Sequence, residues 1–221
     1  MANEITPTIA DYLEAIYNMI DEGKTVIAAR VADRMDVSRP TVSATLRRMR
    51  DQDLVSIDAD NQITLTERGL QLARENIRRH RLAERFLTDL LGLEWHVTHT
   101  EAHNFEHGLS PLVEERLFHL LGEPTTCPHG NPIPGSRASR LPANAVTLDQ
   151  LPPGVSATVL RITEEGERDL DLLRRLQQAG IVPGAQMTAH PADDLIEISS
   201  PKGDLSLPAR QARTIWVQPV S

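Results

Sequence analysis

Residues 27–50 read IAARVADRMDVSRPTVSATLRRMR, and this stretch decides the fold of the amino-terminal part of the chain. Its pattern predicts a short helix over residues 27–35, followed by a three-residue turn around Asp36. Ser38 is a good N-cap for a second helix, and Pro40 falls in the first turn of that helix, where its missing N–H does no harm. Two short helices joined by such a turn are typical of a helix-turn-helix.

The segments on either side complete a larger unit. Residues 7–21 place apolar side chains at i, i+3, i+4, i+7, i+8 and i+11, which predicts an amphipathic helix. After the helix-turn-helix, residues 54–57 and 62–65 have the composition of two short strands joined by a polar turn. Three helices and a hairpin predict a winged helix-turn-helix domain over residues 1–65.

Charge is distributed unevenly along the chain. Residues 24–50 carry seven Lys or Arg against two Asp, a local charge of +5 in a chain whose net charge is −8. Phosphate contacts need cations, so a basic island on an acidic body indicates DNA binding, although any small three-helix unit can look similar. The side chains expected to meet DNA are Ser38, Arg39, Pro40, Thr41, Ser43, Arg47, Arg48 and Arg50.

The chain beyond the hairpin has three further parts. Helices are expected from Thr66 to about residue 91, over 94–107 and over 110–121, whereas short strands and one helix at 168–179 follow a segment with five prolines. The expected boundaries are 66–122 for a helical domain, 123–144 for a proline-rich linker and 145–221 for a small β domain. The fold class is therefore mainly α with a small β domain.

Composition limits the other options. The chain has 221 residues, 40% of them hydrophobic, and neither a leader peptide nor a long apolar run is evident, so we expect a cytoplasmic protein with no membrane partner. The single cysteine, Cys127, excludes an intrachain disulfide and a thiolate-rich zinc or iron–sulfur site. Any metal ion is therefore expected to have nitrogen and oxygen ligands.

Histidines are concentrated in one short helix of the helical domain. Residues 99–107 read HTEAHNFEH, and four of the eight histidines lie within residues 96–107. On an α-helix, four of these side chains share a face about 100° wide: His99, His103, Glu106 and His107. Their ring nitrogens and carboxylate can converge on one point.

Two other helices carry complementary pairs. His80 and Glu84 are four residues apart on the long helix, and Asp11 and Glu14 are three residues apart on the first helix. If the three helices pack together, these side chains can chelate a divalent ion. The alternative is that they are solvated residues of helix surfaces.

Residues 103–107 also permit a catalytic interpretation. They read HNFEH, which matches the H-x-x-E-H pattern of inverted zinc peptidases, with two histidines as ligands and Glu106 as base. Those enzymes are much larger, and nothing in the sequence supplies a substrate cleft. We expect no enzymatic activity and no small-molecule substrate, with a small metallohydrolase as the alternative.

Three runs carry a resemblance to a known family: HRLAERFLTDLLGL at 80–93, HTEAHNFEH at 99–107 and PHGNPIPG at 128–135. They resemble the diphtheria toxin repressor family of metal-dependent transcriptional repressors, with its iron-dependent and manganese-dependent branches. The resemblance covers essentially the whole chain. It implies a homodimer on double-stranded operator DNA, a helical dimerisation and metal-binding domain, and an SH3-like β-barrel similar to that of ferrous-iron transport accessory proteins.

The resemblance also implies two metal sites per subunit. The regulatory site would fall on Asp11, His103, Glu106 and His107, with Glu14 nearby as in the manganese branch. The ancillary site would fall on His80, Glu84 and His99, with a further ligand from the third domain. Asp169 is the nearest match to the glutamate expected there, whereas Leu172 stands where an amide ligand is expected.

The choice of metal depends on the ligand types. Carboxylate and imidazole ligands without sulfur suit Mn²⁺ or Fe²⁺. The iron branch has methionine and cysteine at the positions of Asp11 and His103, whereas the manganese branch has aspartate and usually glutamate. Asp11 therefore favours manganese by a small margin, and His103 matches neither branch.

These features together predict a metal-dependent repressor, with metal-uptake genes as its targets. Ion binding would tie the helical core to the DNA-binding domain and order the dimer for DNA. Apolar side chains of residues 110–121 exceed what one short helix needs, so part of that surface is assigned to dimerisation. A second alternative is a winged-helix regulator that binds no metal.

Overall fold

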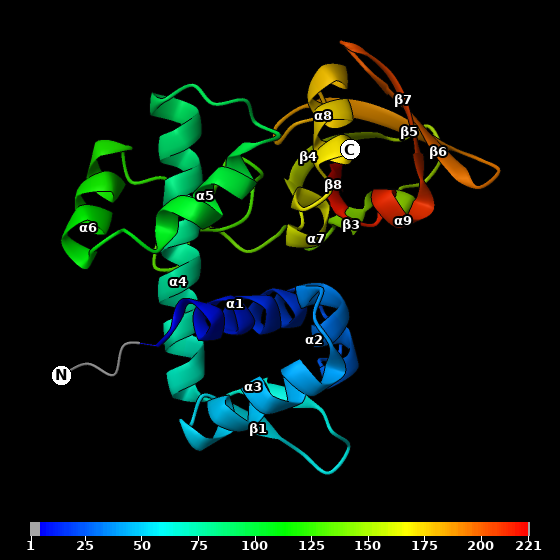
Figure 1. The fold of residues 1–221 in the computed structure, drawn as a ribbon. Coiled ribbons are helices and arrows are strands. Elements are labelled where there is room, and N and C mark those ends of the chain that lie inside the picture. The colour runs from blue at the N-terminus through cyan, green and yellow to red at the C-terminus, as the bar shows by residue number, and fades with distance from the viewer. Residues whose placement is uncertain (1–4, 221) are drawn as a thin grey trace. The chain divides into compact units, whose positions relative to one another are not determined.

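The computed structural model describes residues 5–220. They form two compact units, the first ending at Arg78 and the second beginning at Arg79. Each unit has a hydrophobic core of its own. Figure 1 shows the elements in chain order, from blue near the N-terminus to red near the C-terminus.

The first unit is a winged helix-turn-helix, as predicted. Its elements are α1 (Pro7–Asp21), α2 (Ala28–Met35), α3 (Arg39–Asp51) and the antiparallel hairpin of β1 (Val55–Ile57) and β2 (Ile63–Leu65). The Ser38 hydroxyl caps α3 by accepting a hydrogen bond of 3.3 Å from the backbone N–H of Thr41. Val42, Leu46 and Met49 bury the inner face of α3. The outer face of α3 is therefore left to polar side chains.

The next three helices belong to the expected helical domain. They are α4 (Glu67–Arg85), which continues as a π-helical turn (Phe86–Leu90), α5 (Thr98–Glu106) and α6 (Pro111–Leu120). α4 contains the boundary between the two units. α5 begins four residues later than expected. Trp95, which precedes it, is buried in the core of the C-terminal domain and donates a 3.0 Å hydrogen bond from Nε1 to the carbonyl of Pro128.

The segment predicted as a proline-rich linker is packed in its first half. Cys127, His129, Asn131 and Ile133 are all buried. The backbone N–H of Ile162 donates to the carbonyl of His129 at 2.9 Å, which fastens this segment to a strand of the C-terminal domain. The prolines exclude a helix from this segment but leave its side chains free to be buried.

Gly130 allows this close approach. Its φ is +90°, and a Cβ at this position would lie 2.2 Å from the carbonyl oxygen of Leu160. Only glycine avoids both the strained backbone and the clash.

The C-terminal domain is an antiparallel sheet with the strand order β3-β8-β4-β5-β6-β7. Its elements are β3 (Val146–Thr147), β4 (Ser156–Ile162), α7 (Glu164–Glu167), α8 (Leu170–Ala179), β5 (Gln186–Ala192), β6 (Leu195–Ser200), β7 (Gly203–Pro208), α9 (Ala209–Ala212) and β8 (Ile215–Pro219). The β4–β8 register shifts between Val159 and Arg161, and such a bulge bends the sheet. Figure 1 shows the curled strands of this predicted SH3-like domain in yellow to red.

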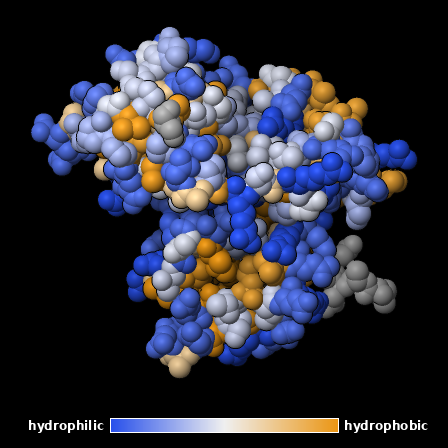
Figure 2. Space-filling view, turned by 180° about the vertical axis from the view of Figure 1, so that it is seen from behind, coloured by the Kyte–Doolittle hydropathy of each residue, from blue (hydrophilic) through white to orange (hydrophobic). Residues whose placement is uncertain are grey.

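Several large apolar side chains remain at the surface of the helical domain. The exposed ones lie in and just after the π-helical turn, on α5 and on α6: Leu90, Leu91, Phe105, Leu112, Val113 and Leu120. Figure 2 shows hydrophobic patches, in orange, on a face of the molecule that is otherwise largely hydrophilic. Within residues 5–220, none of the helices has the length and apolar character needed to span a membrane.

Candidate metal centre

The first predicted surface, on α3, presents its polar side chains to solvent. All eight side chains expected to meet DNA are exposed: Ser38, Arg39, Pro40, Thr41, Ser43, Arg47, Arg48 and Arg50. The basic island is therefore a surface feature. Exposure leaves the four arginines available to an anionic partner.

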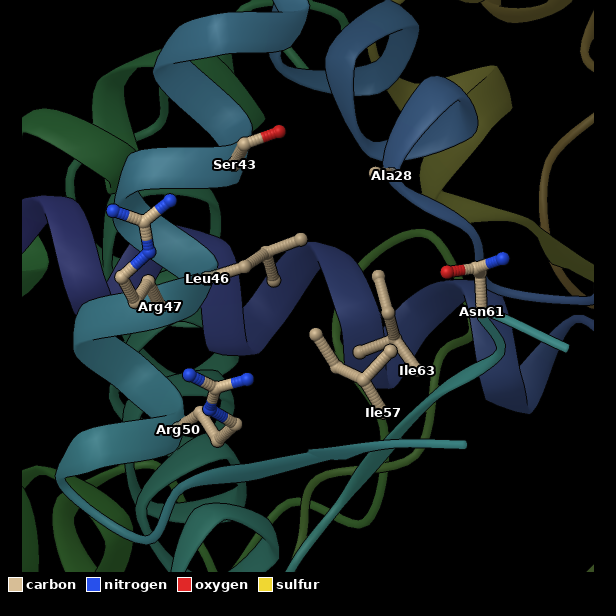
Figure 3. A pocket seen from close by; sticks show the side chains of 8 residues that line it. All are labelled: Ala28, Ser43, Leu46, Arg47, Arg50, Ile57, Asn61 and Ile63. Atoms are coloured by element: carbon tan, nitrogen blue, oxygen red, sulfur yellow. The ribbon is translucent and has the colours of Figure 1, made fainter. Parts of the chain in front are cut away.

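A hollow of about 210 Å³ lies between α3 and the β1–β2 hairpin. Figure 3 shows Arg47 and Arg50 extending from α3 and Asn61 on the opposite side, at the turn of the hairpin. Apolar side chains lie between them, including Leu46 and Ile63. Guanidinium and amide groups around such a hollow suit a phosphate backbone.

The three residues His103, Glu106 and His107 form the α5 stripe. Nδ1 of His103 and Nε2 of His107 each lie 3.6 Å from Oε1 of Glu106. Glu106 is fully buried, whereas the side chains of His103 and His107 are 51% and 31% exposed. Helical spacing thus brings two imidazoles and one carboxylate close together. His99, which the sequence predicts on the same face, lies beside Glu84, Glu164 and Glu167 instead.

His80 connects this stripe to a second group of ligands. Its Nδ1 donates a 2.6 Å hydrogen bond to Oε2 of Glu106. Its Nε2 lies 3.0 Å from Nδ1 of His99 and 3.4 Å from Oε1 of Glu84. One imidazole therefore touches a ligand of each predicted site.

The second group, which we term the buried cluster, contains His80, Glu84, His99, Cys127, His129, Glu164 and Glu167. Nδ1 of His99 lies 3.3 Å from Oε1 of Glu84 and 3.1 Å from Oε2 of Glu167. Nε2 of His99 lies 3.3 Å from Oε1 of Glu164. Ligand atoms of His80, Glu84, His99 and Glu167 all lie within 4.8 Å of one another. These four residues, the imidazole set, can converge on one ion.

The electrostatics of the buried cluster favour a cation. Burial opposes protonation of His99, yet Glu164, Glu167 and Glu84 raise its pKa to about 10. Burial and the neighbouring carboxylates Glu84 and Glu164 raise the pKa of Glu167. Without an ion, protons must offset this crowded negative charge, and a divalent ion can replace them.

Cys127 and His129 belong to the same cluster, although neither was predicted to be a ligand. Nδ1 of His129 lies 3.4 Å from Oε1 of Glu84 and 3.7 Å from Oε2 of Glu167. Ligand atoms of Glu84, Cys127, His129 and Glu167, the thiolate set, lie within 4.8 Å of one another. The expectation of purely nitrogen and oxygen ligands therefore omits a sulfur that lies among them.

The residues present fit a divalent cation. Among residues 5–220, three buried atoms of these groups have no hydrogen-bond partner: Glu84 Oε2, Glu106 Oε1 and His129 Nδ1. Buried polar atoms almost always have a partner, so three such atoms on metal-ligand side chains indicate an ion. The donor types, carboxylate and imidazole with one available thiol, match first-row divalent metals.

Asp169 lies outside this cluster, contrary to the expected third-domain ligand. Its Oδ1 caps α8 by accepting from the backbone N–H of Leu172 at 3.0 Å, and its Oδ2 accepts from Nε2 of Gln211 at 2.8 Å. Glu164 and Glu167, on the preceding short helix α7, face His99 instead. In the sequence, the acidic run TEEGE at 163–167 was the available sign of a ligand from the third domain. Nothing in this run indicated which of its carboxylates faces His99.

Asp11 and Glu14 lie on α1, in the first unit. Glu14 is buried, and its Oε2 accepts a 2.7 Å hydrogen bond from Nδ2 of Asn76 on α4. The contribution of Asp11 and Glu14 to an ion at the α5 stripe stays a prediction.

Comparison with known proteins identifies all three parts of the chain. Residues 4–62 match the N-terminal DNA-binding domain of iron-dependent repressors, residues 66–135 match their metal-binding and dimerisation domain, and residues 146–219 match a FeoA domain. The chain is 40% identical to the iron-dependent repressor IdeR of Mycobacterium tuberculosis over 229 residues, which cover 99% of this chain and 100% of IdeR. The chain belongs to the iron-dependent repressor family.

Two further relatives are also repressors. The diphtheria toxin repressor of Corynebacterium diphtheriae is 33% identical, with 97% of this chain and 98% of that protein covered. A solved manganese-dependent transcriptional repressor in complex with manganese is 31% identical, with a TM-score of 0.83 and coverage of 96% of this chain and 100% of that one. The family is therefore that of iron- and manganese-dependent transcriptional repressors, and the peptidase interpretation of residues 103–107 is not favoured.

Proposed function

We propose that this repressor is a homodimer that two Mn²⁺ or Fe²⁺ ions per subunit activate for binding to operator DNA upstream of metal-uptake genes. The observation that carries the proposal is the pairing, in one chain, of an exposed basic reader helix with two ligand groups joined by His80. A DNA-binding helix can work without a metal site, and a metal site can work without a DNA-binding helix. Together they suit a protein whose DNA affinity depends on metal.

The regulatory ion is assigned to the α5 stripe, with Asp11 as the ligand contributed by the first unit. Two imidazoles and one carboxylate leave coordination positions for the carboxylate of Asp11, and Glu14 stands one helical turn beyond it. When bound, the ion supplies positive charge that offsets repulsion between Asp11 and Glu106. A ligand drawn from the DNA-binding unit is what would make DNA affinity respond to the ion.

The ancillary ion is assigned to the imidazole set, His80, Glu84, His99 and Glu167, with Glu164 beside His99. All of these ligands belong to the second unit. We assign to this site a supporting role, because His80 holds Glu106 of the regulatory site through a 2.6 Å hydrogen bond.

Manganese is favoured over iron by the hard carboxylate of Asp11, although the sequence relatives include proteins named iron-dependent. Dimerisation is assigned to the apolar side chains exposed on and near α6, because Leu112 and Leu120 are 65% and 66% exposed. The same helix buries Leu117, so one face serves the fold and the other is available to a second subunit.

The test is DNA binding with and without metal. Duplexes selected from a random pool by the Mn²⁺-loaded protein are titrated by fluorescence anisotropy in Mn²⁺, in Fe²⁺ under argon, and in chelator. Tight binding in either metal and weak binding in chelator is expected. Equal affinity in chelator would remove metal from the function.

A second arm tests the reader helix. Arg47→Ala should weaken binding to all duplexes alike and reduce the salt slope by about 1, since Arg47 is assigned to phosphate. Ser43→Ala should instead alter sequence preference. Arg174→Ala, an exposed arginine on α8, is the matched control and should change neither. Reversed results for Arg47 and Ser43 would mean that a different face of α3 meets the bases.

A further inference from the structure

The outward face of α3 changes in character along the helix. At about 100° per residue, Pro40 and Ala44 lie on the side of α3 opposite the buried Val42 and Met49, and both are exposed. Three of the four arginines of α3 follow in its second half: Arg47, Arg48 and Arg50. The first half of the helix therefore presents small side chains on the side that faces away from the core.

The polar side chains of this first half are engaged in the cap or lie to one side. Oγ of Ser38 accepts from the backbone N–H of Thr41 at 3.3 Å and lies 2.8 Å from Oγ1 of Thr41, so both hydroxyls take part in the N-cap. Ser43 lines the hollow toward the hairpin (Figure 3), and Arg39, four residues earlier, shares that side of the helix. Ala44 is left near the centre of the outward face, where it offers a methyl group and no hydrogen-bonding atom.

This position matters because the first residues of a recognition helix are the ones that contact base edges in the major groove. Alanine can neither donate nor accept a hydrogen bond, so Ala44 cannot distinguish bases by their donors and acceptors. Thymine, however, also presents an apolar group in this groove, the methyl at its C5 atom, and alanine side chains can contact it. The short side chain lets the helix approach until the two methyl groups touch, at about 4 Å.

We propose that Ala44 reads the operator through the 5-methyl group of one thymine in each half-site, so that α3 selects this base by an apolar contact and not by a hydrogen bond. The inference deepens the proposed function and rests on it for the placement of α3 in the major groove. Arginines on phosphate supply affinity without sequence preference. The methyl contact adds selectivity to that affinity.

The test replaces thymine by uracil, which keeps the base pair and has hydrogen in place of the methyl group. In a duplex selected by the Mn²⁺-loaded full-length protein, each thymine is replaced in turn, and affinity is measured by fluorescence anisotropy. One replacement in each half-site should weaken binding about fourfold, the effect of one buried methyl-sized group. If no uracil weakens binding by about twofold or more, the proposal is wrong, and this result needs no variant of the protein.

A second pair of duplexes isolates the methyl group from the rest of the base pair. At the sensitive position, the T·A pair is replaced by C·G or by 5-methylcytosine·G, which differ only in the methyl group at the same groove position. The methylated duplex should bind about fourfold more tightly than the unmethylated one. Equal affinities would overturn methyl recognition.

Ala44→Gly assigns the contact to one side chain. The variant should bind the thymine duplex about fourfold more weakly than wild type, and its uracil penalty at the sensitive position should disappear. Ala59→Gly, at an exposed alanine in the turn between β1 and β2, is the matched control and should keep the penalty. A penalty that persists in Ala44→Gly arises from the duplex itself or from another side chain, and it overturns the proposal.

The uracil scan and the metal test fail independently. A uracil penalty that depends on Ala44, in a protein that binds equally well in chelator, refutes only the metal activation of the proposed function. Metal-dependent DNA binding without a uracil penalty refutes only methyl recognition by Ala44.

Discussion

The α5 stripe and the buried cluster use the same kinds of side chain in opposite surroundings. The stripe offers three ligands from a single helix, and its two imidazoles are partly exposed. The buried cluster draws on α4, α5, residues 127–129 and α7, and its ligand atoms lie within 4.8 Å of one another in each set. The buried cluster has all its ligands within the second unit, whereas the α5 stripe is open to a further ligand.

The difference between the two groups indicates which of them can regulate DNA binding. A site completed inside one rigid unit can bind an ion without changing anything outside that unit. A site that needs a ligand from another unit couples ion binding to the position of that unit. The α5 stripe is therefore the group assigned to signalling, and the buried cluster supports it through His80. The following variants test that division, from the largest expected effect to the smallest.

Glu106→Gln should abolish metal activation of DNA binding, a loss of about 5- to 150-fold in affinity at saturating Mn²⁺. The change removes the only carboxylate of the α5 stripe and leaves the amide beside His80. The measurement is anisotropy with and without chelator. Glu101→Gln is the control, since Glu101 is exposed on the same helix outside the stripe. Activation that survives in Glu106→Gln would move the regulatory ion away from α5.

Asp11→Met should change the metal preference of the stripe together with activation. A thioether replaces a hard carboxylate, so relative affinity for Mn²⁺ should fall and that for Co²⁺ or Ni²⁺ should rise. Metal titration of wild type and variant, each followed by DNA binding at saturating metal, measures both effects. An unchanged metal order with unchanged DNA affinity would mean that the α5 stripe completes its site without Asp11.

His80→Gln should remove one ion per subunit and weaken activation about tenfold, an effect typical of losing a partner that orients a metal ligand. His80 touches both groups, through Glu106 and through Glu84. Equilibrium dialysis gives the stoichiometry and anisotropy gives the activation. Full activation with one ion lost would show that the two groups are not coupled through His80.

His99→Gln should also remove the ancillary ion in Mn²⁺ but weaken activation by less than about fivefold, below the range expected for the regulatory site. His99 contacts Glu84, Glu164 and Glu167 but not Glu106. His119→Gln, at a half-exposed histidine on α6, is the control. A loss as large as that of Glu106→Gln would contradict the comparison and indicate one coupled cluster.

Local patterns in the sequence determined the elements that depend on neighbouring residues. The cap at Ser38, the spacing of Val42, Leu46 and Met49, and the paired strands after them predicted the winged helix-turn-helix. The α5 stripe followed in the same way, because residues three and four apart on a helix share a face whatever the rest of the chain does.

The tertiary structure alone decided the buried cluster. Glu84, His129 and Glu167 are separated by about 40 residues at each step along the chain, and no local period relates them. The prolines of residues 123–144 indicate a backbone that is not helical, but they do not indicate whether the side chains are buried. The burial of Cys127 and His129 was therefore not predicted. Asp169 and Glu167 are both acidic and two residues apart, but Asp169 caps α8 while Glu167 points at His99. The sequence supplies the candidate ligands, and packing between distant segments selects which of them meet. The reason is that a metal ion needs ligand atoms close together in space, and tertiary packing alone brings residues that are far apart in the chain that close.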